Sequence, residues 1–419
     1  MPRPPPYPRV MRVAVISKAD ASGGGASRIA TELVDQLLAA GYRADHWTAR
    51  QYSPTGHPLR PLYGDRSVVN IPIRAGHTLL RKAGAPELWP IERLNPSLLA
   101  LLSYDILHAH DITNALSVQT LGWLARHRPL VWTLHDCSPF TGGCLYPLDC
   151  VSYREHCGRC PQQGIWPLQG LVDFTEPMLA RKRRFAATTR FTALAPSGWM
   201  ADLAESSSFF PRPQIVSNGI DLSVFRPVAK DQARWQLDLP KDRPLIAICS
   251  SDLGDARKGT RIAFDLARAA RDYSPLVLAI GRRDATLHQE FSGLEIRSSG
   301  FLTDRSTLAL WYSAADLMLF CSLADNQPLT VMEAMACGTP VVGFATGGMP
   351  ELVDQNENGW LASTGGVAAL STQILDILGD RERLRRWSEA AAAKAAREFG
   401  WERCLAAHVT LYQALLSGN

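Results

Sequence analysis

Short apolar runs alternate with segments of helical periodicity along most of this chain, and that alternation constrains the fold more than any other feature. The apolar runs occupy residues 12–16, 105–110, 130–134, 191–195, 245–249, 276–280, 317–321 and 340–344. The helical segments occupy residues 28–40, 179–187, 261–271, 306–314 and 331–337. Continuous apolar runs of this length are typical of strands buried on both faces of a parallel sheet. The pattern therefore predicts an α/β protein with doubly wound sheets.

The chain has 419 residues, whereas one common domain has roughly 150. Ser, Pro and Gly collect between the two series, at residues 196–213. We expect a flexible Pro-rich leader at 1–10, a Rossmann-like domain at 11–213 and a second one at 214–395. A last helix at 396–419 is expected to pack back on the first domain. Two such domains are expected to face a central ligand cleft.

Composition and charge narrow the class of protein. No apolar run approaches the roughly 18 residues that span a membrane, and the Pro-rich start is unlike a secretory leader, so we expect a cytoplasmic protein. The net charge of +4 does not indicate nucleic acid, but residues 1–200 carry 22 Lys and Arg against 14 Asp and Glu. That excess, which includes the basic run 181–184, suits an anionic acceptor or a peripheral membrane contact. An ordinary solvated surface is the alternative.

Residues 325–344 carry the clearest chemical signal. They follow the apolar run 317–321 and are expected to open a short helix at Thr330. A helix N-terminus at the carboxyl end of a parallel strand is a common phosphate site. Asp325 lies eight residues before Glu333, and two such carboxylates can bind sugar hydroxyls. For Glu333 the alternative is a capping box with Thr330.

Four of the nine cysteines are close together in the sequence, within a Cys-rich loop at 137–161. They are Cys144, Cys150, Cys157 and Cys160, at spacings x5, x6 and x2. Four thiolates ending in a CxxC half-site suit a structural zinc ion, and Cys137 or His156 could replace one member. Buried thiols, disulfides and an iron–sulfur site are the alternatives.

Read together, the motifs of this chain resemble the family 4 retaining glycosyltransferases of the GT-B fold. The resemblance covers residues 11–395. Besides residues 325–351, it rests on Gly24-Gly25, Asp105-Ile-Leu-His-Ala-His110, Thr133-Leu-His-Asp136, Pro196-Ser197, Ser217-Asn-Gly-Ile-Asp221, Phe225-x-Pro227, Arg257-Lys-Gly259, Gly300-Phe-Leu-Thr-Asp304 and Ser313-Ala-Ala-Asp316. The stretch from His135 to Cys144, with Cys160-Pro161, resembles the branch that assembles bacterial exopolysaccharides such as colanic acid.

The resemblance implies a metal-independent hexosyltransferase. The donor would be a UDP- or GDP-linked sugar, and the acceptor a glycan or a polyprenyl-diphosphate-linked oligosaccharide. His135, Asp325 and Lys258 would be the catalytic residues, with His135 and Asp325 on the transferred sugar. Glu333 would hold the ribose. The remaining donor contacts would come from Arg257 beside Lys258 and from the backbone at Gly24, Gly25, Leu329 and Thr330.

Two positions depart from the family pattern. Asp325 stands where a Glu is usual, and Leu253 stands where an Arg is frequent, so that Arg257 would have to replace it. Because of these departures, one alternative remains a catalytically silent protein that binds a sugar nucleotide and docks an assembly complex. A nucleotide-sugar epimerase of the GT-B fold is the other alternative.

Overall fold

The computed structural model describes residues 10–50, 59–63, 71–85, 87–282 and 287–418. Nearly all of the expected leader therefore lies outside the described residues. The chain divides into two compact units, one of residues 1–216 with 405–419 and the other of residues 217–404. The division falls three residues after the expected junction, and the last part of the terminal helix belongs to the first unit.

The first unit is built on a parallel sheet. Its described strands have the order β3-β2-β1-β4-β5-β6-β7. They are β1 (Arg12–Ala19), β2 (Arg43–Arg50), β3 (Leu59–Pro61), β4 (Ile106–Ala109), β5 (Leu130–Thr133), β6 (Thr192–Ala195) and β7 (Gln214–Ile215). The main helices are α1 (Gly25–Ala39), α2 (Ile71–Ala83), α3 (Val118–Ala125), α4 (Thr175–Thr188), α5 (Gly198–Glu205) and α14 (Trp401–Ser417).

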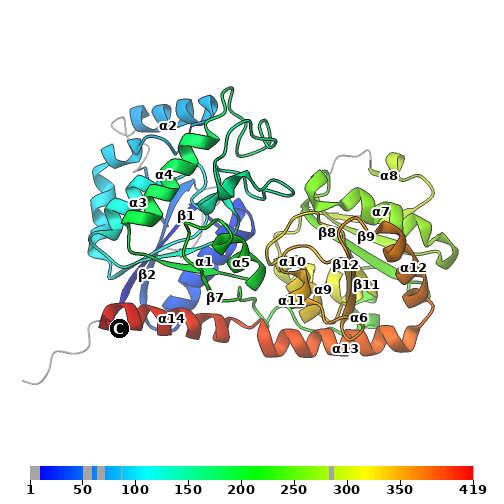
Figure 1. Cartoon of the computed structure of the whole chain (residues 1–419). Coiled ribbons are helices and arrows are strands. Elements are labelled where there is room, and N and C mark those ends of the chain that lie inside the picture. The colour runs from blue at the N-terminus through cyan, green and yellow to red at the C-terminus, as the bar shows by residue number, and fades with distance from the viewer. Residues whose placement is uncertain (1–9, 51–58, 64–70, 86, 283–286, 419) are drawn as a thin grey trace, which may run out of the picture. The chain divides into compact units, whose positions relative to one another are not determined.

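The second unit repeats this plan. Its described strands have the order β10-β9-β8-β11-β12-β13, all parallel. They are β8 (Leu245–Asp252), β9 (Leu276–Arg282), β10 (Glu295–Gly300), β11 (Leu317–Phe320), β12 (Val341–Phe344) and β13 (Gly359–Ala362). The helices are α6 (Lys230–Gln236), α7 (Thr260–Ala269), α8 (Leu287–Glu290), α9 (Arg305–Ala314), α10 (Leu329–Ala336), α11 (Met349–Leu352), α12 (Val367–Leu378) and α13 (Arg381–Glu398). Helices lie on both faces of each sheet (Figure 1).

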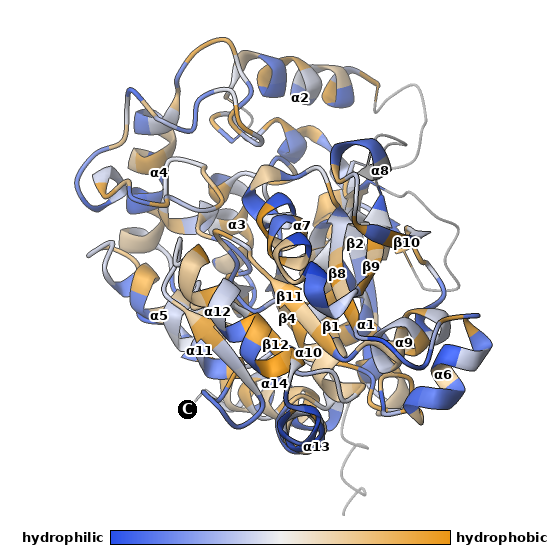
Figure 2. Cartoon of the chain, turned by 90° about the vertical axis from the view of Figure 1, so that its right-hand side faces the viewer, coloured by the Kyte–Doolittle hydropathy of each residue, from blue (hydrophilic) through white to orange (hydrophobic). Residues whose placement is uncertain are grey.

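The central strands explain why the apolar runs were informative. Every residue of β4, β5, β11 and β12 is buried, because helices cover both faces of each sheet. Figure 2 shows strands β11 and β12 in the hydrophobic colour, whereas α13 is strongly hydrophilic. The prediction of an α/β fold with two Rossmann-like units is confirmed. Among the described residues, no helix is long and apolar enough to cross a membrane.

The strand order fixes where ligands can bind. In the first sheet the order reverses between β1 and β4, and in the second between β8 and β11. At such a switch point, the loops that follow the two neighbouring strands run to opposite faces of the sheet. A crevice therefore opens at the carboxyl ends of these strands, and open α/β sheets bind ligands there. Ligand-binding residues are therefore expected at the carboxyl ends of β1, β4 and β5 in one unit, and of β8, β11 and β12 in the other.

Candidate active site

In the second unit, the loops after β8 and β11 bring two predicted residues together. Lys258 ends the short helix η7 (Ala256–Lys258), and its Nζ lies 2.6 Å from Oδ2 of Asp325. Both side chains are partly exposed, 23% for the lysine and 11% for the aspartate. The loops are also joined through their backbones, because the Leu323 N–H donates to the Arg257 carbonyl at 2.8 Å. A cation and a carboxylate are thus held at the switch point of this sheet.

Arg257 takes part in the same arrangement. Its Nη1 donates to the Ala324 carbonyl at 2.7 Å, and its Nη2 lies 3.2 Å from Oδ2 of Asp255. Leu253, by contrast, is 1% exposed and packs in the core of this unit. The position where the family often has an arginine therefore carries a core residue. The guanidinium of Arg257 lies against Ala324, the residue before Asp325.

Two glycines allow these loops to approach one another. Gly259 and Gly347 both have φ of +60°. A Cβ atom on Gly259 would lie 1.9 Å from the Cys321 carbonyl oxygen, and one on Gly347 would lie 1.6 Å from that of Asp325. Since neither contact is sterically possible, only glycine fits at either position.

Helix α10 corrects one interpretation made from the sequence. It begins at Leu329 with Pro328 at the N-cap, and no side chain caps it. Thr330 is therefore the second helical residue, and the capping box with Glu333 is wrong, since that motif requires Thr330 to be the N-cap. Glu333 is fully buried in the middle of the helix, where a carboxylate is costly unless it has a specific role or partner.

Gln327 is a residue of this loop that the sequence did not single out. Its Oε1 accepts from the Asn218 N–H, and its Nε2 donates to Ser217 Oγ, both at 2.8 Å. The side chain thereby ties the loop after β11 to the segment that opens this unit. Since its partners lie more than 100 residues away in sequence, no local pattern indicated it.

In the first unit, histidines collect behind the ends of β4 and β5. His110 Nδ1 lies 2.9 Å from His135 Nε2, and the two rings are stacked. Behind them, His108 is bonded to Tyr412 of α14 at 2.6 Å and to Thr133 at 2.7 Å. Burial lowers the pKa of His135 to about 4 and those of His108 and His110 well below their usual value. All three rings are therefore neutral at pH 7.

Charged residues border His135. Lys18 lies near the carboxyl end of β1, and its Nζ is 2.5 Å from Asp111 Oδ2 and 4.5 Å from the centre of the Trp166 ring. Burial, and then the charge of Asp111, raise the pKa of Asp136 to about 6. Lys18 and Asp111 were not predicted, although Lys18 is the penultimate residue of β1 and Asp111 lies two residues after β4. Their positions at the carboxyl ends of parallel strands were the signal, because no motif surrounds either residue.

The glycines of the first loop are placed at the start of α1. Gly24 is the N-cap, with φ of +111°, and Gly25 is the first helical residue. A Cβ on Gly24 would meet nothing within 4 Å, so the backbone there is open to approach. The structure thus puts Gly24 and Gly25 at the same sheet edge as Lys18.

Comparison with known proteins agrees with both units. Residues 23–224 match the family described as Glycosyltransferase Family 4, and residues 230–394 match the one described as Glycosyl transferases group 1. A D-inositol 3-phosphate glycosyltransferase of Xylanimonas cellulosilytica is 30% identical over 327 residues, which are 74% of this chain and 72% of that protein. This chain belongs to the family 4 glycosyltransferases.

Other proteins similar to this glycosyltransferase include solved structures that show its fold. The putative colanic acid biosynthesis glycosyl transferase WcaC of Escherichia coli is 25% identical over 297 residues, 66% of each chain. Sucrose-phosphate synthase from Thermosynechococcus elongatus superposes with a TM-score of 0.73 at 23% identity, covering 98% of this chain and 100% of that one. Anabaena HepE, solved in complex with UDP-glucose, gives 0.64 at 19% identity, with the same two coverages. These structures confirm the GT-B fold.

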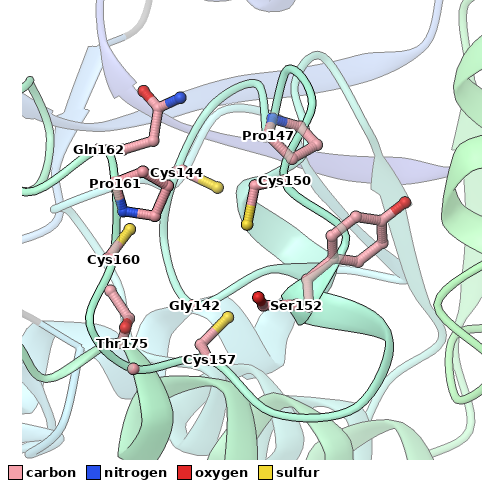
Figure 3. A pocket seen from close by; sticks show the side chains of 12 residues that line it. Gly142, Cys144, Pro147, Cys150, Ser152, Cys157, Cys160, Pro161, Gln162 and Thr175 are labelled. Carbon is pink, nitrogen blue, oxygen red and sulfur yellow. The ribbon is translucent and has the colours of Figure 1, made fainter.

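The glycosyltransferase also has the Cys-rich loop, where the structure gathers the four predicted cysteines. Cys144, Cys150, Cys157 and Cys160 line one cavity of about 20 Å³, and Figure 3 shows their sulfur atoms turned toward it. Neither Cys137 nor His156 is among the lining residues. Over the residues that the structure describes, no group of three or more His, Cys, Asp or Glu side chains is spaced closely enough to hold a metal ion.

The basic run 181–184 offers fewer exposed charges for an anionic partner than its sequence indicates. Lys182 is 2% exposed. Its Nζ lies 3.0 Å from Glu87 Oε2 and donates to the Ser138 carbonyl at 2.8 Å. One of the four charges is therefore neutralised inside the unit.

Proposed function

We propose that this glycosyltransferase is a retaining, metal-independent hexosyltransferase that uses a UDP- or GDP-linked sugar. The acceptor is a glycan or a polyprenyl-diphosphate-linked oligosaccharide in exopolysaccharide assembly. The observation that carries the proposal is the Lys258–Asp325 pair at the switch point of the second sheet, with Glu333 buried in the next helix. The names of WcaC and of the HepE complex with UDP-glucose support the pathway and the donor class.

The second unit is proposed to bind the donor. Lys258 and Arg257 neutralise the diphosphate, together with the N–H groups of Leu329 and Thr330 at the start of α10. A leaving diphosphate gains negative charge in the transition state, so cations and N–H groups already in place lower the barrier. Glu333 accepts hydrogen bonds from the ribose, and Asp325 accepts them from the transferred sugar.

The first unit is proposed to carry the acceptor and the other contacts to the sugar. A neutral His135 can donate one hydrogen bond to a sugar hydroxyl without adding charge, and the open backbone at Gly24 and Gly25 allows a substrate to approach. Retention follows from attack on the face that the diphosphate leaves. The leaving phosphate oxygen takes the acceptor proton, so no protein nucleophile is required.

The excess of basic residues in the first half supports a peripheral contact with the cytoplasmic face of the membrane, where a polyprenyl-linked acceptor would be found. Since Lys182 is buried, this contact would depend on the other basic residues of the unit.

Calorimetric titration with UDP, GDP, ADP and dTDP tests the donor proposal. We expect one nucleotide to bind, and Lys258→Ala to abolish most of that binding. The matching sugar nucleotide, with acceptor extracts, should then give a product whose anomeric configuration NMR shows to be retained. An inverted product would contradict the retaining mechanism. Absence of binding to all four nucleotides would favour the silent docking protein, whose support is Leu253 and the shortened carboxylate at Asp325.

A further inference from the structure

A long irregular loop separates η5 (Ser138–Phe140) from α4. Between residues 141 and 174, the structure contains one short helix, η6 (Ser152–Arg154). Loops beyond about 12–15 residues without secondary structure are uncommon in compact domains. They are held by their own packing, by a disulfide or by a metal ion.

Apolar packing within the loop is limited, with Tyr153 and Leu168 as its large buried apolar side chains. Several of its large apolar side chains face solvent: Leu148, Val151, Ile165, Trp166, Leu171 and Val172. The small core beneath it consists of Ala85, Leu88, Cys144, Leu168 and Met178, with Cys160 and Phe174 at its edge. Two of these seven residues are cysteines that also line the cavity described above. In this small core, thiols therefore occupy positions that larger apolar side chains would fill if packing alone held the loop.

The placing of the four cysteines is selective. Cys144 and Cys157 are buried, Cys150 and Cys160 are half-buried, and all four converge from separate turns of the loop (Figure 3). Cys137, only seven residues before Cys144, does not line this cavity, although it packs in the main core of the unit as Cys157 also does. Ordinary buried thiols would have no reason to collect around one cavity while a near neighbour does not.

We propose that Cys144, Cys150, Cys157 and Cys160 bind one structural zinc ion in this cavity. Zinc takes four thiolates in a tetrahedron, at about 2.3 Å from each sulfur. Since no three such side chains in the described ranges already have the spacing of a metal site, binding draws the four turns inward. Each thiol releases its proton to solvent as its sulfur bonds to the ion, so that binding and loop closure are one event.

The loop contacts the edge where His135 lies. The Cys137 N–H donates to the Leu145 carbonyl at 2.8 Å, which joins the segment after His135 to the residue after Cys144. Trp166, from the far part of the loop, lies over Lys18. A zinc ion that fixes the loop would therefore also fix the surroundings of His135 and Lys18, without taking part in the reaction.

Metal analysis of the full-length protein, purified without chelators, tests the proposal. We expect one zinc per chain, and cobalt substitution should give the absorption bands of a tetrahedral thiolate site. Cys144→Ser and Cys157→Ser should lose the metal. Cys249→Ser, which changes a cysteine in the other unit, should retain it.

A second measurement covers the case in which those variants fail to fold. Chelation of the wild-type protein should make residues 141–174 sensitive to proteolysis, and added zinc should restore protection. Nine free thiols with well under one zinc per chain would overturn the proposal in favour of buried thiols. Fewer free thiols without metal would overturn it in favour of disulfides, and bound iron in place of zinc would overturn it as well.

Discussion

His110 and His135 share one hydrogen atom between Nδ1 and Nε2, which lie 2.9 Å apart in stacked, buried rings. Both rings are neutral at pH 7, because burial lowers the pKa of each. His110 Nε2 is buried without a hydrogen-bond partner in the part of the chain that the structure describes. Orphaned N–H groups are rarer than under-satisfied acceptors in protein interiors. His110 therefore carries its hydrogen on Nδ1 and donates it, which leaves the hydrogen of His135 on Nδ1.

This relationship predicts unequal effects of two substitutions. His110→Asn keeps an N–H close to the position of Nδ1 and should retain most of kcat. His110→Ala removes the bond and should lower kcat about tenfold, the value of one hydrogen bond of about 1.4 kcal/mol. Nitrogen-15 NMR of His135 should show the Nδ1–H tautomer in the wild type and a mixture in His110→Ala. The exposed His127→Asn serves as the control, and an unchanged His135 tautomer in His110→Ala would contradict the role.

Glu333 offers a test of the donor site. Glu333→Gln keeps the size of the buried side chain but removes its charge. Because hydrogen bonds to a charged group contribute about 1.5–3 kcal/mol, nucleotide affinity should fall roughly 10- to 150-fold in calorimetry. The exposed Glu357→Gln, in the same unit, should bind as the wild type does. Unchanged affinity in Glu333→Gln, with the fold intact, would exclude the ribose contact.

Lys258→Ala should discriminate between ligands by their phosphates. If Lys258 neutralises the diphosphate, the variant should lose more affinity for a nucleoside diphosphate than for the monophosphate of the same base. Raising the salt concentration should narrow the gap between wild type and variant, because salt screens exposed charges. Lys241→Ala, an exposed lysine of this unit, is the matched control. Equal losses for both nucleotides would indicate that the lysine acts through the structure of its loop.

The buried histidines predict a stability that falls in acid. Burial lowers the pKa of His77 and His135 to about 4, and those of His108 and His110 well below their usual value. Between pH 6.5 and about 4 the unfolded chain therefore binds protons that the folded chain does not, and stability decreases as pH falls. Asp136, whose pKa is raised to about 6, keeps its proton in the folded state and partly opposes the trend.

Denaturant unfolding at several pH values measures this effect. Each additional proton taken up on unfolding lowers stability by about 1.4 kcal/mol per pH unit. His77→Gln, in α2 and away from His110 and His135, should reduce the slope by about one proton. A free energy of unfolding that stays constant from pH 7 to pH 5 would contradict the prediction.

The strands buried on both faces could be predicted because their apolar content leaves no other placement. Strands β10 and β13 escaped prediction, since they form the two edges of their sheet and carry exposed or half-exposed residues. The start of α10 was also misjudged. Pro328 stands at its N-cap without a capping side chain, so the helix begins one residue before Thr330.

The candidate site divides in the same way. Asp325 and Glu333 share one short segment, so their spacing was visible in the sequence. The contact between Lys258 and Asp325 joins residues 67 positions apart and depends on two glycine-bearing loops. The pairing of His110 with His135 likewise requires β4 and β5 to be neighbours in register, as they are.

In the ion pair between Lys258 and Asp325, the two charges at the switch point of the second sheet neutralise each other. With the roles proposed above, an incoming diphosphate would have to compete with Asp325 for the ammonium group, and a sugar bound to Asp325 at the same time would remove that competitor. The intact donor would then be held better than the spent nucleotide, which lacks the sugar. After transfer, Asp325 would regain Lys258, and this would favour departure of the product.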